Sequence, residues 1–274
     1  MLGLLLLQVL ASCLYLGHSE VVNSFDVCRQ FFYAGTLPNG ALQPSNPARI
    51  CQRYSNAYHY ATLYNREKRI PVYSAYIYHQ KTCKRPHQPW LLEPQLINRN
   101  YVNEMSTEDS IKKQYKITSD QIAQSQAINQ DYKNLKDLDR GHLGPCSHQR
   151  DEKQMTATFT LTNIVPQYSK LNKGAWKDYE SVTMAQKTQD CKTTYVITGA
   201  VPGNNKIGNR VTIPSYIWSA ACCVGDTGPK SAWGAIAEND KDKVDVLSLG
   251  QLEAKLTEKY GGRVTLFNNA CPRE

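Results

Sequence analysis

The cysteines limit the possible folds of this chain more than any other feature of its sequence. Nine cysteines occur among 274 residues, and one of them, Cys13, lies in an apolar leader. The remaining eight form an even set, which is typical of disulfide frameworks in proteins that fold in an oxidising compartment. A zinc site is the alternative, but no two cysteines have C-x-x-C spacing, so we predict up to four disulfides with the pairing open. The eight are Cys28, Cys51, Cys83, Cys146, Cys191, Cys222, Cys223 and Cys271.

Two of these cysteines, Cys222 and Cys223, are adjacent in the chain. They end a segment rich in β-branched and aromatic residues, which favours a strand. Because successive side chains of a strand point to opposite faces, we predict that these two cysteines pair with different partners.

The leader, MLGLLLLQVLASCLYLGHS, covers residues 1–19 and contains no Lys, Arg, Asp or Glu. An apolar run that ends in small residues is typical of a secretory signal peptide, with an approximate cleavage site. A membrane anchor is the alternative, but the run is short for a spanning helix. We therefore predict a secreted, extracellular protein without stable membrane association, in which residues 20–274 form a single domain.

The charge balance is basic, with a formal net charge of +8 at pH 7. Basic residues recur along the chain, as in REKR, KTCKR and KLNKGAWK, and are not gathered in one tail. Such a surface attracts polyanions, but composition alone favours a solvated surface without a partner. The net charge indicates a function only if the chain also carries a site that binds phosphate.

Residue periodicity predicts an α+β protein. Four segments rich in Val, Ile, Thr and Tyr are expected to be strands at the centre of a sheet. They are residues 69–80, 156–166, 193–202 and 209–222. Helices are expected after a cap at Ser119, from Asn172 to about Gln189, and from Ser248 to Tyr260, where Ser248 and Gln251 form a capping box.

The stretch KDLDRGHLGP, residues 136–145, is the first candidate site. On a strand, the period of two places Arg140 and His142 on one face, while Gly141 allows another group to approach the backbone. A guanidinium can hold phosphate oxygens, and a neutral imidazole can take a proton from water. A surface turn with a solvated arginine is the competing interpretation.

The stretch LTNIVPQYSKLNKGAWKDYE is the second candidate site. Asn163 and Gln167 lie at the end of an expected strand, and Asn172, Trp176 and Glu180 share one broad side of an expected helix. Magnesium binds oxygen ligands, keeps most of its waters and often takes one or two protein groups. Asn172 is the candidate ligand and Glu180 the candidate for orienting a bound water. The competing interpretation is a helix cap and a solvated charge.

Together, DRGHLGP and LTNIVPQYSKLNKGAW, followed by a glutamate four residues after the tryptophan, resemble the DNA/RNA non-specific endonucleases. This family includes Serratia-type nuclease and endonuclease G. The stretch CRQFFYAGTLP, the leader and the scattered cysteines are similar to a secreted vertebrate branch of it. The resemblance implies a ββα-metal (His-Me finger) nuclease fold, with a central antiparallel sheet flanked by helices and stabilised by disulfides.

The resemblance also implies roles for the candidate residues. His142 would be the general base, Arg140 would stabilise the charged transition state, and Asn172 would bind a single Mg²⁺, with Mn²⁺ possible. Glu180 would position the hydration shell of the metal, and Asn163 would support the site.

Three further residues receive roles from the same resemblance. Asp139 would set the local geometry, and Gln167 and Lys187 are candidates for contact with the substrate. The implied substrates are DNA and RNA, cut to 5′-phosphorylated fragments.

One departure from the family pattern concerns the helix. Family members with high activity usually carry an arginine one turn after the glutamate, where this chain has Met184. Lys187 lies nearby in sequence, but an ammonium does not reproduce a bidentate guanidinium. Arg85 is a loosely matched candidate for a further substrate arginine upstream. The alternative function is therefore a secreted nucleic-acid-binding protein with the same fold and little turnover; a purely structural disulfide-rich protein is a third reading.

Overall fold

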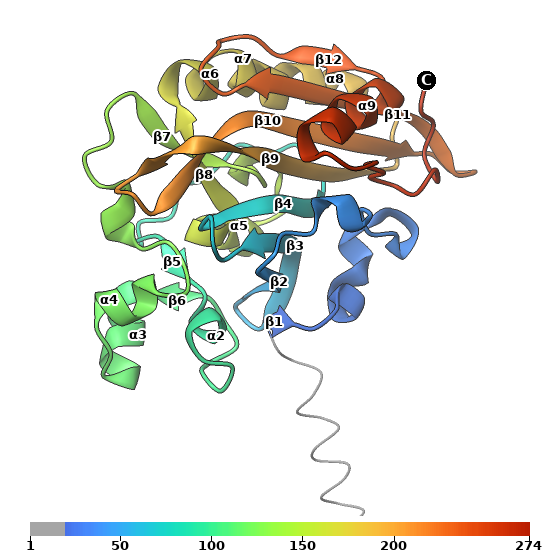
Figure 1. Cartoon of the computed structure of the whole chain (residues 1–274). Coiled ribbons are helices and arrows are strands. Elements are labelled where there is room, and N and C mark those ends of the chain that lie inside the picture. Colours follow the sequence, from blue (N-terminus) through green and yellow to red (C-terminus); the bar gives the residue numbers. More distant parts are fainter. Residues whose placement is uncertain (1–19) are drawn as a thin grey trace, which may run out of the picture.

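The computed structural model describes residues 20–274, so the predicted leader lies outside the described part of the chain. An antiparallel sheet of eight strands forms its centre, in the order β1-β2-β3-β4-β9-β10-β11-β12 (Figure 1). Three of the predicted strands are β4, β9 and β10, which are neighbours at the centre of this sheet, as expected. The strands are β1 Val21–Val22, β2 Pro47–Tyr54, β3 Ala57–Asn65, β4 Ile70–Ile77, β9 Thr193–Ile207, β10 Val211–Val224, β11 Pro229–Glu238 and β12 Asp245–Leu247.

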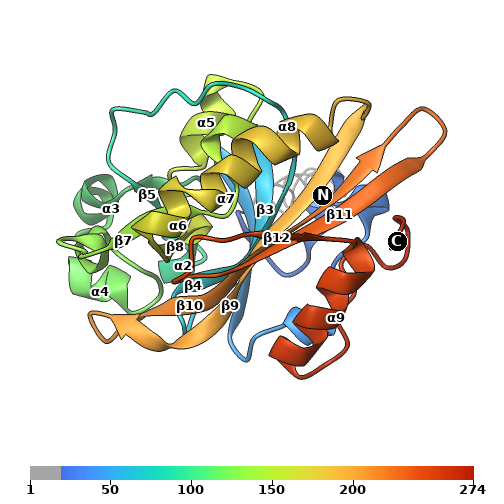
Figure 2. The ribbon, with the colours of Figure 1, turned by 90° about the horizontal axis from the view of Figure 1, so that it is seen from above.

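Strand β10 shows that both faces of this sheet are buried. Trp218 and Cys222 point into the hydrophobic cluster on one face, and Ala221 and Cys223 point into the cluster on the other. This follows from the period of two along a strand. Figure 2 shows the corresponding layers, with α9 on one side of β9, β10 and β11 and the helices α6, α7 and α8 on the other.

Helix α9, Leu249–Tyr260, covers the first face. The predicted capping box is present, because the Ser248 side chain accepts from the Gln251 backbone and the Gln251 side chain accepts from the Ser248 backbone. The leucines at helical spacing in this sequence, Leu249, Leu252 and Leu256, form the buried stripe of the helix and are each at most 1% exposed. The helix therefore begins and packs as the sequence predicts.

The second face is covered by four short helical segments that follow one another and by α5. Trp176, Tyr179 and Met184 are among the buried side chains of this layer. The segments are α5 Glu152–Ala157, α6 Ser169–Lys173, α7 Ala175–Asp178, the π-helical turn Tyr179–Thr183 and α8 Met184–Lys187.

The prediction of one continuous helix from Asn172 to about Gln189 is wrong. Gly174 has φ −101° and ψ −118°, which is outside the helical region. The Asp242 carboxylate accepts a hydrogen bond from the backbone N–H of Ala175 at 2.7 Å. A side chain from a distant loop therefore caps the helix that begins at Ala175. A β-carbon at Gly174 would overlap Asp242, so this break depends on glycine.

The prediction of a strand over residues 156–166 is wrong except at its end. Residues Leu161–Asn163 form a 3-10 turn, and only β8, Ile164–Tyr168, is a strand. The segment is expected from its sequence to lie at the centre of a sheet, and Thr158, Thr160 and Thr162 are indeed buried, but outside any strand. Their hydroxyls donate to the Met155 carbonyl or to the Glu93 carboxylate. These hydrogen bonds replace those that the hydroxyls would make with water, so the threonines can be buried.

A small lobe between β4 and the candidate site contains short elements. Its helix α4 begins one residue earlier than predicted, because the Thr118 side chain, and not that of Ser119, caps it by accepting from the Gln121 backbone. The elements are β5 Leu91–Leu92, α2 Pro94–Ile97, β6 Ser106–Thr107, α3 Glu108–Tyr115 and α4 Ser119–Ala123. No helix within residues 20–274 is long and apolar enough to cross a bilayer.

All eight cysteines that follow the leader form disulfides. Cys222 pairs with Cys271, near the end of the chain, and Cys223 pairs with Cys191, so the prediction of different partners is confirmed. A third disulfide links Cys28 to β2 through Cys51. The fourth, Cys83–Cys146, ties the segment after β4 to the turn that follows β7, Leu138–His142, close to the candidate site.

Candidate active site

A two-stranded hairpin carries the residues of the first motif. Strand β7, Leu138–His142, pairs antiparallel with β8, and Arg140 lies opposite Pro166. Side chains alternate between the faces of a strand, so Arg140 and His142 share one face and Asp139 lies on the other. Helix α6 follows β8, so β7, β8 and the helical segments form a ββα unit (Figure 1).

The His142 imidazole lies between two aromatic rings. Its centroid is 5.3 Å from that of Trp90 and 4.9 Å from that of Phe159, which it meets edge to face. Burial, with a further contribution from the positive charge of Arg85, lowers the pKa of His142 to about 4. Its Nε2 is buried without a hydrogen-bond partner among the described residues. The ring is therefore a neutral base with spare hydrogen-bonding capacity.

Stacking holds the Arg140 guanidinium on the same face. Its carbon lies 5.2 Å from the ring centroid of Trp90 and 5.5 Å from that of Tyr132. Nη2 donates to the Asn129 carbonyl at 3.5 Å, whereas Nε is buried without a partner in the described part of the chain. A guanidinium fixed by stacking, with unused donors, suits an anionic ligand.

An open pocket of about 510 Å³ lies against this face. Arg85, Trp90, Arg140 and Phe159 line it, together with residues 86–89. Arg85 is brought here by the Cys83–Cys146 disulfide, which anchors the loop that carries it. The sequence predicts Arg85 only as a loose candidate and does not predict Trp90 or Phe159, because the pairing of Cys83 with Cys146 cannot be derived from sequence.

The opposite face of the hairpin holds the candidate metal ligand. Asn172 Nδ2 donates to Asp139 Oδ2 at 3.1 Å, and Lys173 Nζ contacts Asp139 Oδ1 at 3.1 Å. Partial burial raises the pKa of Asp139, but hydrogen bonds from Asn172, Lys173 and Ser169 outweigh it and the pKa is lowered. A carboxylate can only accept, so the Asn172 amide nitrogen must face it and Oδ1 is turned away.

Glu180 lies in the π-helical turn, one turn beyond Trp176. The Trp176 indole donates to Glu180 Oε1 at 2.9 Å, which confirms that the two side chains share one side of the helix. Burial raises the pKa of Glu180 to about 8, and the indole hydrogen bond opposes this shift only partly. A neighbouring cation would favour its ionised form.

Asn172 and Glu180 carry donor atoms of the kind that binds a hydrated divalent cation. Asn172 offers an amide oxygen, and Glu180 offers the carboxylate oxygen that the indole does not use. Within residues 20–274 no three His, Cys, Asp or Glu side chains gather into a metal site. Oxygen donors in small number match an ion such as Mg²⁺, which keeps most of its waters.

Asn163 is a buried positioning residue and is 0% exposed. Its Oδ1 accepts from the Ser74 hydroxyl and from the Gly144 N–H, both at 2.9 Å. Its Nδ2 donates to the carbonyls of Gly144 and Thr158. The amide therefore ties the turn after His142 to β4 of the central sheet and has no free group to offer a substrate.

Gln167 supports the hairpin from within and is 1% exposed. Its side chain fills the space above Gly141, where a β-carbon would overlap it. The group that approaches the backbone at Gly141 is therefore the Gln167 side chain. Its burial does not favour contact with a substrate.

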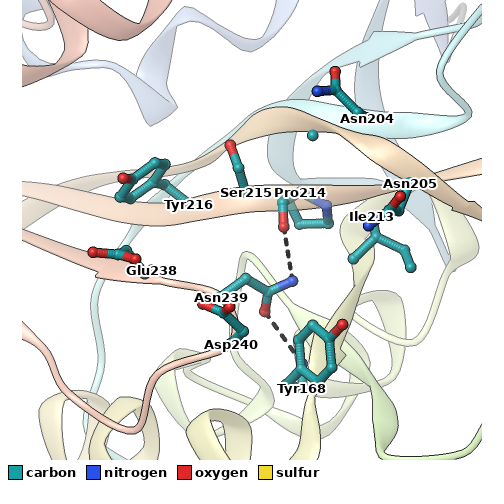
Figure 3. Close-up of a pocket in the computed structure, with 11 residues that line it drawn as sticks. Tyr168, Asn204, Asn205, Ile213, Pro214, Ser215, Tyr216, Glu238, Asn239 and Asp240 are labelled. Atoms are coloured by element: carbon teal, nitrogen blue, oxygen red, sulfur yellow. Dashed lines mark hydrogen bonds between the residues drawn. The ribbon is translucent and has the colours of Figure 1, made fainter.

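The end of β8 is fixed by Asn239, as Figure 3 shows. The Asn239 side chain accepts from the Tyr168 N–H at 3.2 Å and donates to the Pro214 carbonyl at 2.9 Å. It also donates to the Pro166 carbonyl at 3.1 Å. These hydrogen bonds join the hairpin to β10 and fix the end of β8, where α6, the helix that contains Asn172, begins.

Lys187 and Met184 place no positive charge beside Arg140. The Lys187 ammonium lies 5.4 Å from the ring centroid of Trp233 on β11, and no interaction in the described chain joins it to Arg140 or His142. Met184 is fully buried in the core. The π-helical turn changes the helical register after Glu180, so the Met184 side chain, at the start of the next turn, points into the core.

The residues named from sequence therefore form two groups, one on each side of the hairpin. Arg140 and His142 share the aromatic face with Arg85, and Asp139 and Asn172 share the other face. No hydrogen bond or ion pair within residues 20–274 joins His142 to Asn172 or to Glu180.

Comparison with known proteins supports the same motifs. The family model of the DNA/RNA non-specific endonucleases matches residues 37–269. The endonuclease domain-containing 1 proteins of Homo sapiens and Mus musculus are 33% and 34% identical over 251 and 252 residues. Each alignment covers 90% of this chain and 48% of the relative, so the chain spans about half the length of these relatives.

More distant similarity extends to endonuclease G. The mitochondrial endonuclease G of Homo sapiens is 37% identical over 78 residues, which are 28% of this chain and 26% of that protein. A chain in the crystal structure of the EndoG/EndoGI complex superposes with a TM-score of 0.51 at 18% identity, covering 79% of this chain and 84% of that one. At this identity the superposition confirms the predicted fold class alone. The family match and the two long alignments establish that this chain belongs to the DNA/RNA non-specific endonuclease family.

Proposed function

We propose that this chain is a secreted, metal-dependent endonuclease that hydrolyses phosphodiester bonds of DNA and RNA without marked sequence preference. The observation that carries the proposal is a neutral His142, whose Nε2 has no hydrogen-bond partner within residues 20–274, beside the stacked guanidinium of Arg140. Membership of a nuclease family over residues 37–269 supports it. The disulfides and the leader support secretion, with residues 20–274 as the nuclease domain.

His142 is the general base in this proposal. It accepts a proton from a water molecule while the water oxygen forms a bond to phosphorus. The bond between phosphorus and the 3′ oxygen breaks, and that oxygen takes up a proton, which leaves a 5′-phosphate and a 3′-hydroxyl. Arg140 donates to the phosphate oxygens, whose negative charge increases on the way to the transition state.

Asn172 and Glu180 hold the metal in this proposal, with Mg²⁺ the expected ion and Mn²⁺ an alternative. Asn172 Oδ1 is the direct ligand, and Glu180 accepts a hydrogen bond from a metal-bound water. When bound, the cation supplies Lewis-acid stabilisation of charge on the phosphate group. Asp139 orients the Asn172 amide, and Asn163 fixes the turn after His142.

Replacing the proposed ligand tests the metal site. Asn172→Ala removes the only direct protein ligand, so we expect plasmid and RNA cleavage to fall by at least about 100-fold. Asn172→Asp keeps an oxygen donor but places a second carboxylate beside Asp139, so an intermediate loss is expected. Cleavage is measured across a Mg²⁺ titration, with EDTA as the control. Wild-type rates in Asn172→Ala would remove this residue from the site.

The pH dependence of cleavage tests the state of the base. Because burial and Arg85 lower the pKa of His142 to about 4, the imidazole stays unprotonated as the pH falls below 6.5. The acid limb of kcat/KM is therefore expected near pH 4. Arg85→Gln removes a positive charge that disfavours the imidazolium, so the limb should move to higher pH. An acid limb at pH 6.5 in both proteins would contradict this assignment.

A nucleic-acid-binding protein with little turnover is the second candidate function. Core burial of Met184 and the stacking of Lys187 on Trp233 favour it, because neither adds a positive charge beside Arg140. Binding through the phosphate backbone would weaken steeply with salt in either case. Retardation of DNA on a gel without Mg²⁺-dependent cleavage would select this function.

A further inference from the structure

We infer that His148 is a positioning residue that holds the turn of Glu180 in its π-helical register, and thereby aims the Glu180 carboxylate. The inference rests on the proposed function, because it assigns Glu180 to the metal. His148 lies six residues after His142, at the end of the 3-10 turn Cys146–His148. It is 2% exposed, so it does not act as a surface group or contact the substrate.

The hydrogen bonds of His148 define its tautomer. Its Nε2 lies 3.0 Å from the backbone carbonyl oxygen of Glu180, and its Nδ1 lies 3.0 Å from the Tyr76 hydroxyl. A carbonyl can only accept, so Nε2 carries the proton and donates to Glu180. Nδ1 is then the acceptor, and the Tyr76 hydroxyl donates to it. Strand β4 of the central sheet thus orients the ring.

The turn needs this donor because its register is irregular. In a regular α-helix the N–H of Met184 would donate to the Glu180 carbonyl. Here it donates to the carbonyl of Tyr179, as a π-helical turn requires. The Glu180 carbonyl loses its α-helical donor, and the His148 imidazole takes that place. A buried carbonyl without a donor would cost free energy, so the His148 bond stabilises the π-helical turn.

The register of this turn sets the direction of the Glu180 side chain. A shift of one residue along a helix rotates a side chain by about 100° around the axis. Return to the α-helical register would therefore strain the bond from Trp176 to the Glu180 carboxylate. His148 also sits in the segment that Cys146 anchors by its disulfide to Cys83. Its bond thus links the turn after His142 to the turn that carries Glu180.

Three substitutions of His148 separate the donor from the bulk of the ring. His148→Gln places an amide N–H near the position of Nε2, His148→Asn is too short to reach it, and His148→Phe keeps a ring without a donor. Tyr76→Phe is the matched control, because it removes the hydroxyl bonded to Nδ1 and leaves the Nε2 donor. Circular dichroism and thermal melting identify the variants that are folded.

The readouts are Mn²⁺ binding, followed by electron paramagnetic resonance, and the Mg²⁺ half-saturation of cleavage. We expect His148→Asn and His148→Phe to weaken metal binding by about 10- to 100-fold, as loss of a supporting partner does. We expect His148→Gln and Tyr76→Phe to stay within a few-fold of the wild type, and KM for DNA to change little in all four.

Two results would overturn the inference. One is wild-type metal binding by folded His148→Phe, and the other is a His148→Gln variant as defective as His148→Phe, which would assign the effect to ring packing. Absence of cleavage by the wild type would overturn the proposed function instead. Mn²⁺ binding by the variants would still decide the role of His148 in that case.

Discussion

His142→Ala is expected to lower kcat for plasmid and RNA cleavage by about 10²- to 10⁴-fold, the range that a general base contributes. The alanine removes the neutral imidazole that lies between Trp90 and Phe159 and leaves the Arg140 guanidinium stacked. Affinity for DNA should therefore change much less than the rate. Single-turnover cleavage and gel retardation, both at saturating Mg²⁺, measure the two quantities.

The control for this variant is His87→Ala. His87 lines the pocket that Arg85 and Arg140 also line, and it lies outside β7 and β8. Its loss should leave the rate within a few-fold of the wild type if position on β7 is what makes His142 the base. Equal losses in both variants would contradict the assignment of the base to His142.

Met184→Arg is expected to destabilise the protein by about 3 kcal/mol or more, because it buries an unpaired charge. Met184 is 0% exposed and lies in the cluster that contains Tyr60, Tyr76 and Tyr179. An arginine introduced here to match more active relatives would therefore not reach a phosphate. Chemical denaturation measures the change in the free energy of unfolding.

Met184→Leu is the matched control for that experiment. A volume-conserving apolar substitution should cost less than about 1.5 kcal/mol. If Met184→Arg unfolded at the same denaturant concentration as Met184→Leu and cleaved DNA faster than the wild type, position 184 would face the substrate and the core assignment would be wrong.

The parts of the fold that the sequence predicts are those specified by local chemistry. The strands β4, β9 and β10 follow from alternating β-branched and aromatic residues, and α9 follows from the capping box at Ser248. The separate partners of Cys222 and Cys223 follow from the alternation of a strand. Each of these patterns is complete within a short window, so no distant residue is needed to interpret it.

The parts that the sequence does not predict depend on contacts between distant residues. The break at Gly174 requires the Asp242 carboxylate, which is 67 residues away from the N–H of Ala175. The π-helical turn at Glu180 is supported by His148, which is 32 residues away in sequence. The residues around Glu180 therefore do not predict the π-helical turn by themselves. Long-range side-chain donors and acceptors override local helical preference at both positions.

The candidate site divides in the same way. The motif DRGH predicts a shared face for Arg140 and His142, because only the period of a strand is required. Trp90 and Phe159 could not be assigned to this site from sequence, since tertiary packing and the Cys83–Cys146 disulfide bring their segments to β7. From sequence, Gln167 is a candidate for contact with the substrate. In the structure, the Gln167 side chain is buried against Gly141, in space that a β-carbon at position 141 would fill.

The most direct test of the central claim is cleavage of supercoiled plasmid and total RNA by the purified, oxidised chain of residues 20–274, with Mg²⁺ and with EDTA. We expect Mg²⁺-dependent loss of both substrates, EDTA to abolish it, and the fragments to carry 5′-phosphates. A folded, oxidised protein that retards DNA on a gel but cuts neither substrate with Mg²⁺ or Mn²⁺ would contradict the claim and establish a binding protein on a nuclease fold.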